Sequence, residues 1–186
     1  SLYNAMINPL INFRIKGAIW YQGESNVSRA SNYAKLKNSM IEGWRRAWNQ
    51  GSFPFYFVQI APFQYPREKK TALDQSQKLR EAQRSTLNTI NTGMVVTMDI
   101  GNFNNIHPSN KQAVGKRLAG LALANEYGKQ LVASGPLFKS IKRRGEILVV
   151  NFAEIGSGLI SKGALRGFEI AGLDMIYKVA EANIIN

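Results

Sequence analysis

The sequence predicts an α/β fold in which helices cover both faces of a parallel sheet. Two observations lead to this prediction. Three short apolar runs at residues 17–21, 55–61 and 94–98 are typical of buried strands. Longer segments with helical patterning follow each run, and strands that alternate with helices form parallel βαβ units. At 186 residues, the chain is long enough for one domain with a core and a small appendage.

The first helices flank the first predicted strand. Residues 2–13 are predicted to form an apolar helix before it. After it, a helix is expected at about residues 31–48, with a cap at Ser28 or Ser31. Several apolar side chains recur on one face of this helix, namely Tyr33, Leu36, Met40, Ile41 and Trp44.

Two more helices complete the predicted sheet domain. A strongly polar helix is expected at residues 73–87, and another at about 110–127, which Gly128 stops. Ligands of such sheets bind at the carboxyl ends of the strands. We therefore expect a functional site in the loops that follow the first and third strands.

The sequence pattern changes at about residue 131. Short β-like segments at residues 137–141, 146–152 and 167–170 are separated by turns that contain glycine. We expect residues 1–130 to form the sheet domain and residues 131–186 to form a partial β-rich appendage.

Composition narrows the function classes. With no cysteine and one histidine, the chain offers no disulfide, thiolate nucleophile or conventional zinc centre, and we expect no cofactor. The net charge is +12, but basic pairs such as Arg45-Arg46, Lys116-Arg117 and Arg143-Arg144 form no single stripe, so no nucleic-acid partner is expected. No apolar run reaches the roughly 18 to 20 residues that cross a bilayer, so no membrane contact is expected.

The single histidine, His107, lies in a polar loop and is a candidate general base. An ester hydrolase also needs a nucleophile, a group that orients the base, and donors for the oxyanion. Glu24, or as second choice Asp99, would hold the imidazolium. The Gln22 side-chain amide would donate to the oxyanion, assisted by backbone N–H groups around Gly23.

The nucleophile is the missing component. Ser25 follows Glu24, but Gly-Glu-Ser-Asn lacks the second glycine of the Gly-x-Ser-x-Gly elbow. We therefore expect Ser25 to cap the loop rather than to attack a substrate. Glu24 also has a structural alternative, a loop carboxylate that pairs with Arg29.

Four ordered motifs resemble those of the sialate O-acetylesterases. They are Leu-Tyr-Asn-Ala-Met-Ile at residues 2–7, Gly-Ala-Ile-Trp-Tyr-Gln-Gly-Glu-Ser-Asn at 17–26, Leu-Arg-Glu-Ala-Gln at 79–83 and Asn-Ile-His-Pro-Ser-Asn-Lys at 105–111. That family belongs to the SGNH hydrolases and is similar to the carbohydrate esterases that deacetylate xylan. Segments 134–137 and 167–172 also resemble its β-rich region, so the resemblance covers nearly the whole chain.

The resemblance implies a three-layer α/β/α, flavodoxin-like SGNH domain that is truncated at its N-terminus. His107 matches the family's catalytic histidine, and Gln22 and Glu24 match the oxyanion-hole glutamine and the proposed partner of the histidine. The family's nucleophilic serine lies in a Gly-Gln-Ser-Asn motif upstream of residues 2–7, and this sequence has no such motif. It therefore resembles the C-terminal portion of an O-acetylesterase that acts on sialic acid or, second, on xylan-type sugars.

The sequence departs from the family pattern next to the histidine. Asn104 and Asn105 stand where SGNH enzymes commonly place aspartate, so either Glu24 is the acid or the site is a Ser-His dyad. The residues expected to meet substrate are Gly23, Asn26, Asn105 and Arg80. We consider two hypotheses for Arg80: it contacts a sugar carboxylate, or it forms an ion pair with Glu81.

The resemblance also sets expectations about partners. A sheet without its leading strands exposes an apolar edge, so we expect the chain to retain an upstream segment or to pair with another copy. A signal peptide would lie upstream, which implies a secreted or periplasmic protein. The alternative function is a non-catalytic carbohydrate-binding or scaffold module derived from the esterase fold.

Overall fold

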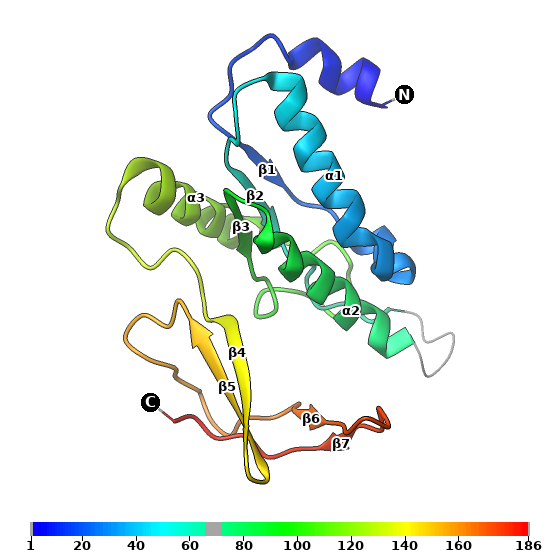
Figure 1. Cartoon of the computed structure of the whole chain (residues 1–186), viewed down its shortest axis with the longest axis vertical. Coiled ribbons are helices and arrows are strands. Elements are labelled where there is room, and N and C mark those ends of the chain that lie inside the picture. Colours follow the sequence, from blue (N-terminus) through cyan, green and yellow to red (C-terminus); the bar gives the residue numbers. More distant parts are fainter. Residues whose placement is uncertain (1, 66–71, 186) are drawn as a thin grey trace. The chain divides into compact units, whose positions relative to one another are not determined.

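A three-stranded parallel sheet forms the centre of the first of two units in the chain, Ser1–Ser134 and Gly135–Asn186. The computed structural model describes residues 2–65 and 72–185, and each unit is described by itself. The strands β1 (Ala18–Trp20), β2 (Phe55–Val58) and β3 (Thr92–Val95) lie in that order (Figure 1). Both strand pairs are parallel, which confirms the predicted α/β class.

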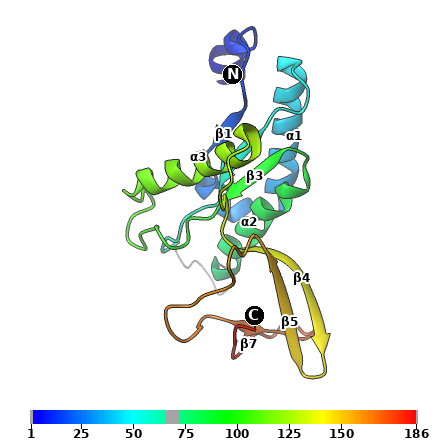
Figure 2. The same cartoon turned by 90° about the vertical axis from the view of Figure 1, so that its left-hand side faces the viewer.

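Helices cover both faces of this sheet, as predicted. Helices α1 (Ala30–Trp48) and α2 (Ala72–Ser85) contact each other on one face, and α3 (Lys111–Tyr127) covers the other (Figures 1 and 2). Gly128 ends α3 in the left-handed conformation with φ 62°, as the sequence indicates. None of the helices in residues 2–65 and 72–185 is long and apolar enough to span a membrane.

The central strand β2 is buried at all four positions because helices pack on both of its faces. On the α1 face, Trp20 and Phe55 contact Trp44, with ring centroids 5.9 Å from that of Trp44 in each case. On the α3 face, the core contains Tyr56, Val58, Val95, Val114, Leu118 and Leu121. This packing fixes which strand ends are available for a site.

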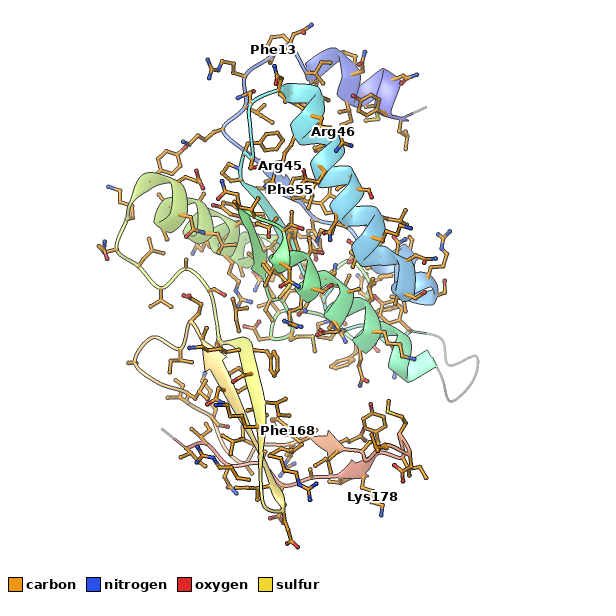
Figure 3. All side chains as sticks on the ribbon, viewed as in Figure 1. Phe13, Arg45, Arg46, Phe55, Phe168 and Lys178 are labelled. Atoms are coloured by element: carbon orange, nitrogen blue, oxygen red, sulfur yellow. The ribbon has the colours of Figure 1, made fainter. Side chains whose placement is uncertain are left out.

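The amino edge of the sheet is closed by Arg45, a buried arginine on α1. Its Nη2 donates to the carbonyls of Phe53 and Ile90, each at 2.8 Å, and to that of Asn91 at 3.2 Å. Figure 3 shows Arg45 reaching toward the end of the sheet that carries Phe55. Buried carbonyls need donors, so this guanidinium stabilises the segments that enter β2 and β3.

Two local predictions are wrong. In place of one helix over residues 2–13, the chain forms a π-helical turn (Tyr3–Ile7) and a 3-10 turn (Asn8–Leu10), where Pro9 supplies no N–H for an α-helical ladder. Neither Ser28 nor Ser31 caps α1. A 3-10 helix over Glu24–Arg29 runs directly into it, so its first turn has no free start for a side chain to cap.

The second unit is a small β structure. An antiparallel hairpin joins β4 (Leu137–Arg144) to β5 (Ile147–Ala153), with Gly145 at φ 60° in the turn. Two short strands, β6 (Glu169–Ile170) and β7 (Lys178–Val179), also pair antiparallel. Strand β6 lies within the predicted segment 167–170, whereas β7 lies outside every predicted segment.

Candidate active site

The loop after β1 holds Gln22 in a fixed orientation at the carboxyl edge of the sheet. The Gln22 Nε2 atom donates to Asn26 Oδ1 at 2.6 Å. The Tyr33 hydroxyl, from α1, lies 2.9 Å from the Gln22 carbonyl oxygen and 3.3 Å from Gln22 Oε1. The primary amide carries two N–H groups, so one remains for a ligand after the bond to Asn26.

Gly23 is buried where two other segments approach the backbone closely. A Cβ at this position would lie 2.7 Å from Ile60 Cγ2 and 2.8 Å from Gln83 Nε2. Both distances are shorter than real Cβ contacts allow, so any larger residue here would force these two side chains to shift. The predicted oxyanion loop therefore packs closely against the segment after β2 and against α2.

Gln83, on α2, hydrogen-bonds to this loop. The sequence analysis did not single it out. Its Nε2 donates to the carbonyls of Gln22 at 3.4 Å and Val58 at 3.3 Å, and its Oε1 accepts from Ile60 N–H at 2.9 Å. The side chain is fully buried. An available signal was a glutamine inside the Leu-Arg-Glu-Ala-Gln motif, on the helix face that also carries the buried Leu79.

His107 lies exposed in the loop that follows β3. Its backbone N–H donates to Asn105 Oδ1 at 2.8 Å, so that amide oxygen orients the loop backbone. Two contacts connect this loop region to the other strand ends. Lys111 Nζ lies 4.6 Å from the ring centroid of Tyr21, and Gln64 N–H donates to the Phe103 carbonyl at 2.9 Å.

The two carboxylates considered as partners of His107 have different surroundings. Both oxygens of Asp99 accept from the Arg117 guanidinium, at 2.7 and 2.6 Å, and these bonds lower the pKa of Asp99. Within residues 2–65 and 72–185, Glu24 has no hydrogen bond or ion pair, including with Arg29. Burial raises the pKa of Tyr65 to about 12, and the nearby Glu24 charge adds to that rise. Of these two carboxylates, Glu24 is therefore the one without a hydrogen-bond or ion-pair partner among the described residues.

Arg80 serves the backbone of the segment after β2. Its Nε lies 3.3 Å from the Ile60 carbonyl oxygen, and its Nη2 lies 3.4 Å from that of Ala61. Glu81 binds Arg84 instead of Arg80, with an Nε to Oε2 distance of 2.8 Å, so the expected Arg80–Glu81 ion pair is wrong. Among the described residues, no group of three histidine, aspartate or glutamate side chains is arranged to hold a metal.

The loops after β1 and β3 therefore lie at one edge of the sheet, with Gln22 and Gly23 braced and His107 exposed. Comparison with known proteins identifies the class as carbohydrate esterases. The family described as sialic acid-specific acetylesterase matches residues 1–127, and the chain belongs to this family.

Individual relatives agree with this assignment. Human sialate O-acetylesterase is 34% identical over 189 residues, covering 91% of this chain and 36% of that protein. The rat enzyme of the same name is 35% identical, covering 81% and 31%. A crystal structure described as a novel carbohydrate acetylesterase from Xanthomonas citri superposes with a TM-score of 0.92 at 42% identity, covering 99% of this chain and 43% of that one. The chain thus spans about a third of the length of the curated relatives it matches.

Proposed function

We propose that this chain forms part of a carbohydrate O-acetylesterase, which hydrolyses acetyl esters on sugars by Ser-His chemistry. The observation that carries the proposal is the Gln22–Gly23 loop, which Tyr33 and Gln83 hold at the sheet edge that also bears the His107 loop. Fixed donors at such a site stabilise the charge that develops on an ester oxygen. The names of the relatives support O-acetylated sugars as substrates, with sialic acid first. Xylan-type sugars are the second candidate because of the motif resemblance alone.

The reaction would proceed in two acyl-transfer steps. A serine Oγ attacks the acetyl carbonyl and gives its proton to His107. The tetrahedral intermediate then expels the sugar oxygen, which takes that proton. Water attacks the acetyl-serine and gives a proton to His107, which returns that proton to the serine Oγ as the ester bond breaks, so acetate leaves and the serine is regenerated. The Gln22 amide and the Gly23 region would donate to the oxyanion in both steps.

The serine would come from a segment that precedes residue 1 in a longer polypeptide. The outer edge of β1 supports this part of the proposal. Ile19, at the centre of β1, is 69% exposed, and β1 pairs with β2 on one side alone among the described strands. An apolar edge strand of this kind favours further pairing, either with such a segment or with a second copy of the chain.

The remaining site residues would contact the sugar. Gly23 follows Gln22 and Asn26 accepts a hydrogen bond from it, whereas Asn105 and Arg80 come from the neighbouring loop and helix. Because Asn105 Oδ1 and the Arg80 guanidinium also bind backbone groups, their substrate contacts would use the hydrogen-bonding capacity that remains.

Acetate release tests this proposal. An activated acetyl ester and O-acetylated sialic acid are incubated with the 186-residue chain and with a longer polypeptide that includes the preceding segment. Each form is also assayed as His107→Ala. We expect release by the longer form, reduced about 10²–10⁴-fold in His107→Ala.

The other outcomes are equally informative. Release by the 186-residue chain would contradict an upstream nucleophile and make Ser25 the first residue to replace. No release by either form, with both folded, would contradict the esterase and favour a non-catalytic carbohydrate-binding module.

A further inference from the structure

A pocket of about 140 Å³ opens beside the Gln22 loop, between β1 and α1. Its walls combine polar and apolar side chains, namely Trp20, Gln22, Asn26, Tyr33, Leu36, Lys37 and Met40. A pocket of this volume accepts a group of several heavy atoms. The nature of its walls decides which group fits.

Lys37 is the unusual residue in these walls, because it is a lysine with 4% exposure. Its Nζ lies 3.0 Å from the ring centroid of Phe57 and 5.6 Å from that of Tyr33. Among the described residues, Nζ has no hydrogen-bond partner. Trp20 Nε1 has none with hydrogen-bond geometry, although it lies near enough to the Tyr33 hydroxyl to offset part of the rise that burial causes in the pKa of Tyr33. A buried donor without a partner costs free energy that a bound acceptor would recover.

The acceptor groups in these walls are already used within the pocket. Gln22 Oε1 lies within hydrogen-bonding distance of the Tyr33 hydroxyl, and Asn26 Oδ1 accepts from Gln22 Nε2. No lining residue is acidic. The groups without a partner are therefore the Lys37 amine, the Trp20 indole N–H and the second N–H of the Gln22 amide, all of which donate.

We propose that this pocket binds a small carboxylate, which accepts hydrogen bonds from Lys37 and Trp20. The flexible lysine stem lets Nζ turn from the Phe57 ring toward the pocket. A carboxylate pairs with an ammonium more strongly than a neutral acceptor does. Leu36 and Met40 supply an apolar wall for a short alkyl group, which makes acetate the smallest ligand that matches both parts of the pocket.

Binding of a carboxylate would change the protonation of Lys37. Burial lowers the pKa of Lys37 to about 6, so the amine is mostly neutral at pH 8. A carboxylate beside it favours the charged form, so binding would take up a proton. Tyr33 is the other titratable residue of the pocket walls, and burial raises its pKa, so it stays neutral at pH 8.

The site is tested by titrating the isotopically labelled chain with acetate. The readout is the NMR signal of the Trp20 indole N–H. We expect a saturable shift, proton uptake at pH 8 in calorimetry with two buffers, and about tenfold weaker binding to Lys37→Met. Lys35→Met is the matched control, since Lys35 lies exposed on the same helix. Acetamide, a neutral isostere, should bind at least about tenfold more weakly than acetate.

Several results would overturn the proposal. They are no saturable shift with acetate, equal binding by Lys37→Met and the parent chain, or equal binding of acetamide and acetate. Circular dichroism establishes that each variant is folded. No esterase activity is needed for these measurements, so they fail or succeed separately from the proposed function.

The source of the carboxylate is distinguished by a second pair of ligands, and this part does rest on the proposed function. Acetate would be the reaction product, whereas a sugar acid would present its own carboxylate. Displacement of acetate by N-acetylneuraminic acid but not by its methyl ester would assign the pocket to the sugar acid. Displacement by neither would assign it to the product.

Discussion

The buried side-chain amide of Gln83 donates to the backbone carbonyl of Gln22, at 3.4 Å, across 61 residues of sequence. The same amide also binds the carbonyl of Val58 and the N–H of Ile60. One side chain on α2 therefore connects the chain segments that leave β1 and β2. The position of the proposed oxyanion loop depends on this connection.

Gln83→Leu should destabilise the chain by about 2–4 kcal/mol, because leucine leaves the Ile60 N–H and two carbonyls without this partner. Urea unfolding followed by circular dichroism measures the loss. Gln77→Leu is the control, since Gln77 is exposed on the same helix. Equal stability of the Gln83 and Gln77 variants would show that the three bonds contribute little.

Gly23→Ala should destabilise by about 1–3 kcal/mol, because the new Cβ overlaps Ile60 and Gln83 and nearby groups must shift. Gly115→Ala provides the contrast. A Cβ at Gly115 meets no atom of the described residues within 4 Å, and alanine favours the interior of α3, so this variant should gain about 0.5–1 kcal/mol. Thermal unfolding of both variants checks the opposite signs.

The strands and main helices were predictable because their signals are local. Apolar runs mark β1 and β2, and residues at helical spacing mark α1 and α3. Strand β3 begins at Thr92, two residues before the predicted run, because Thr92 and Gly93 extend it through backbone pairing with Phe55 and Tyr56. Backbone pairing of this kind leaves little trace in the side-chain pattern.

The hydrogen bonds that position the site residues were less predictable than the site residues themselves. Gln22 and His107 were identified by motif and by residue type. The roles of Tyr33 and Gln83 depend on hydrogen bonds to Gln22 across 11 and 61 residues. The side chain of Tyr33 also packs in the core with Val27 and Leu79, so an apolar helix face describes it equally well. Tertiary contacts of this kind are not visible in residue spacing.

Lys37→Met should alter how stability depends on pH. The pKa of Lys37 falls from 10.5 to about 6 on burial, so between these values the unfolded chain binds a proton that the folded chain does not. The free energy of unfolding should therefore rise with pH from about 6 toward 10, by a few kcal/mol, and level off below about pH 6.

Methionine fills the same space without a titrating amine, so the Lys37→Met variant should lose this rise. Urea unfolding at pH 6, 7, 8 and 9 compares it with the parent chain and with Lys35→Met. Tyr33, the neighbouring titratable group, has a raised pKa and stays neutral over this range. A parent chain whose stability is flat or falls from pH 6 to 9 would contradict a buried neutral lysine.

Two substitutions, Asp99→Asn and Glu24→Gln, distinguish which carboxylate is the acid partner of His107. Arg117 binds both oxygens of Asp99 and lowers its pKa, whereas Glu24 has no such partner in the described part of the chain. In whichever form of the protein releases acetate, Asp99→Asn should keep its rate within a few-fold. The exposed ion pair should contribute no more than about 1 kcal/mol, present above the ordinary pKa of aspartate and lost as pH falls through the lowered value.

Glu24→Gln should act differently if Glu24 stabilises the imidazolium. An amide keeps the shape of the side chain but not its charge, so the rate should fall by about 10²–10⁴-fold while stability barely changes. Acetate release and urea unfolding of both variants separate the two effects. Near-parental release by Glu24→Gln would instead indicate a Ser-His dyad, because the histidine would then work without a carboxylate. A large loss in Asp99→Asn alone would transfer the role to Asp99 and require Arg117 to release it during the reaction.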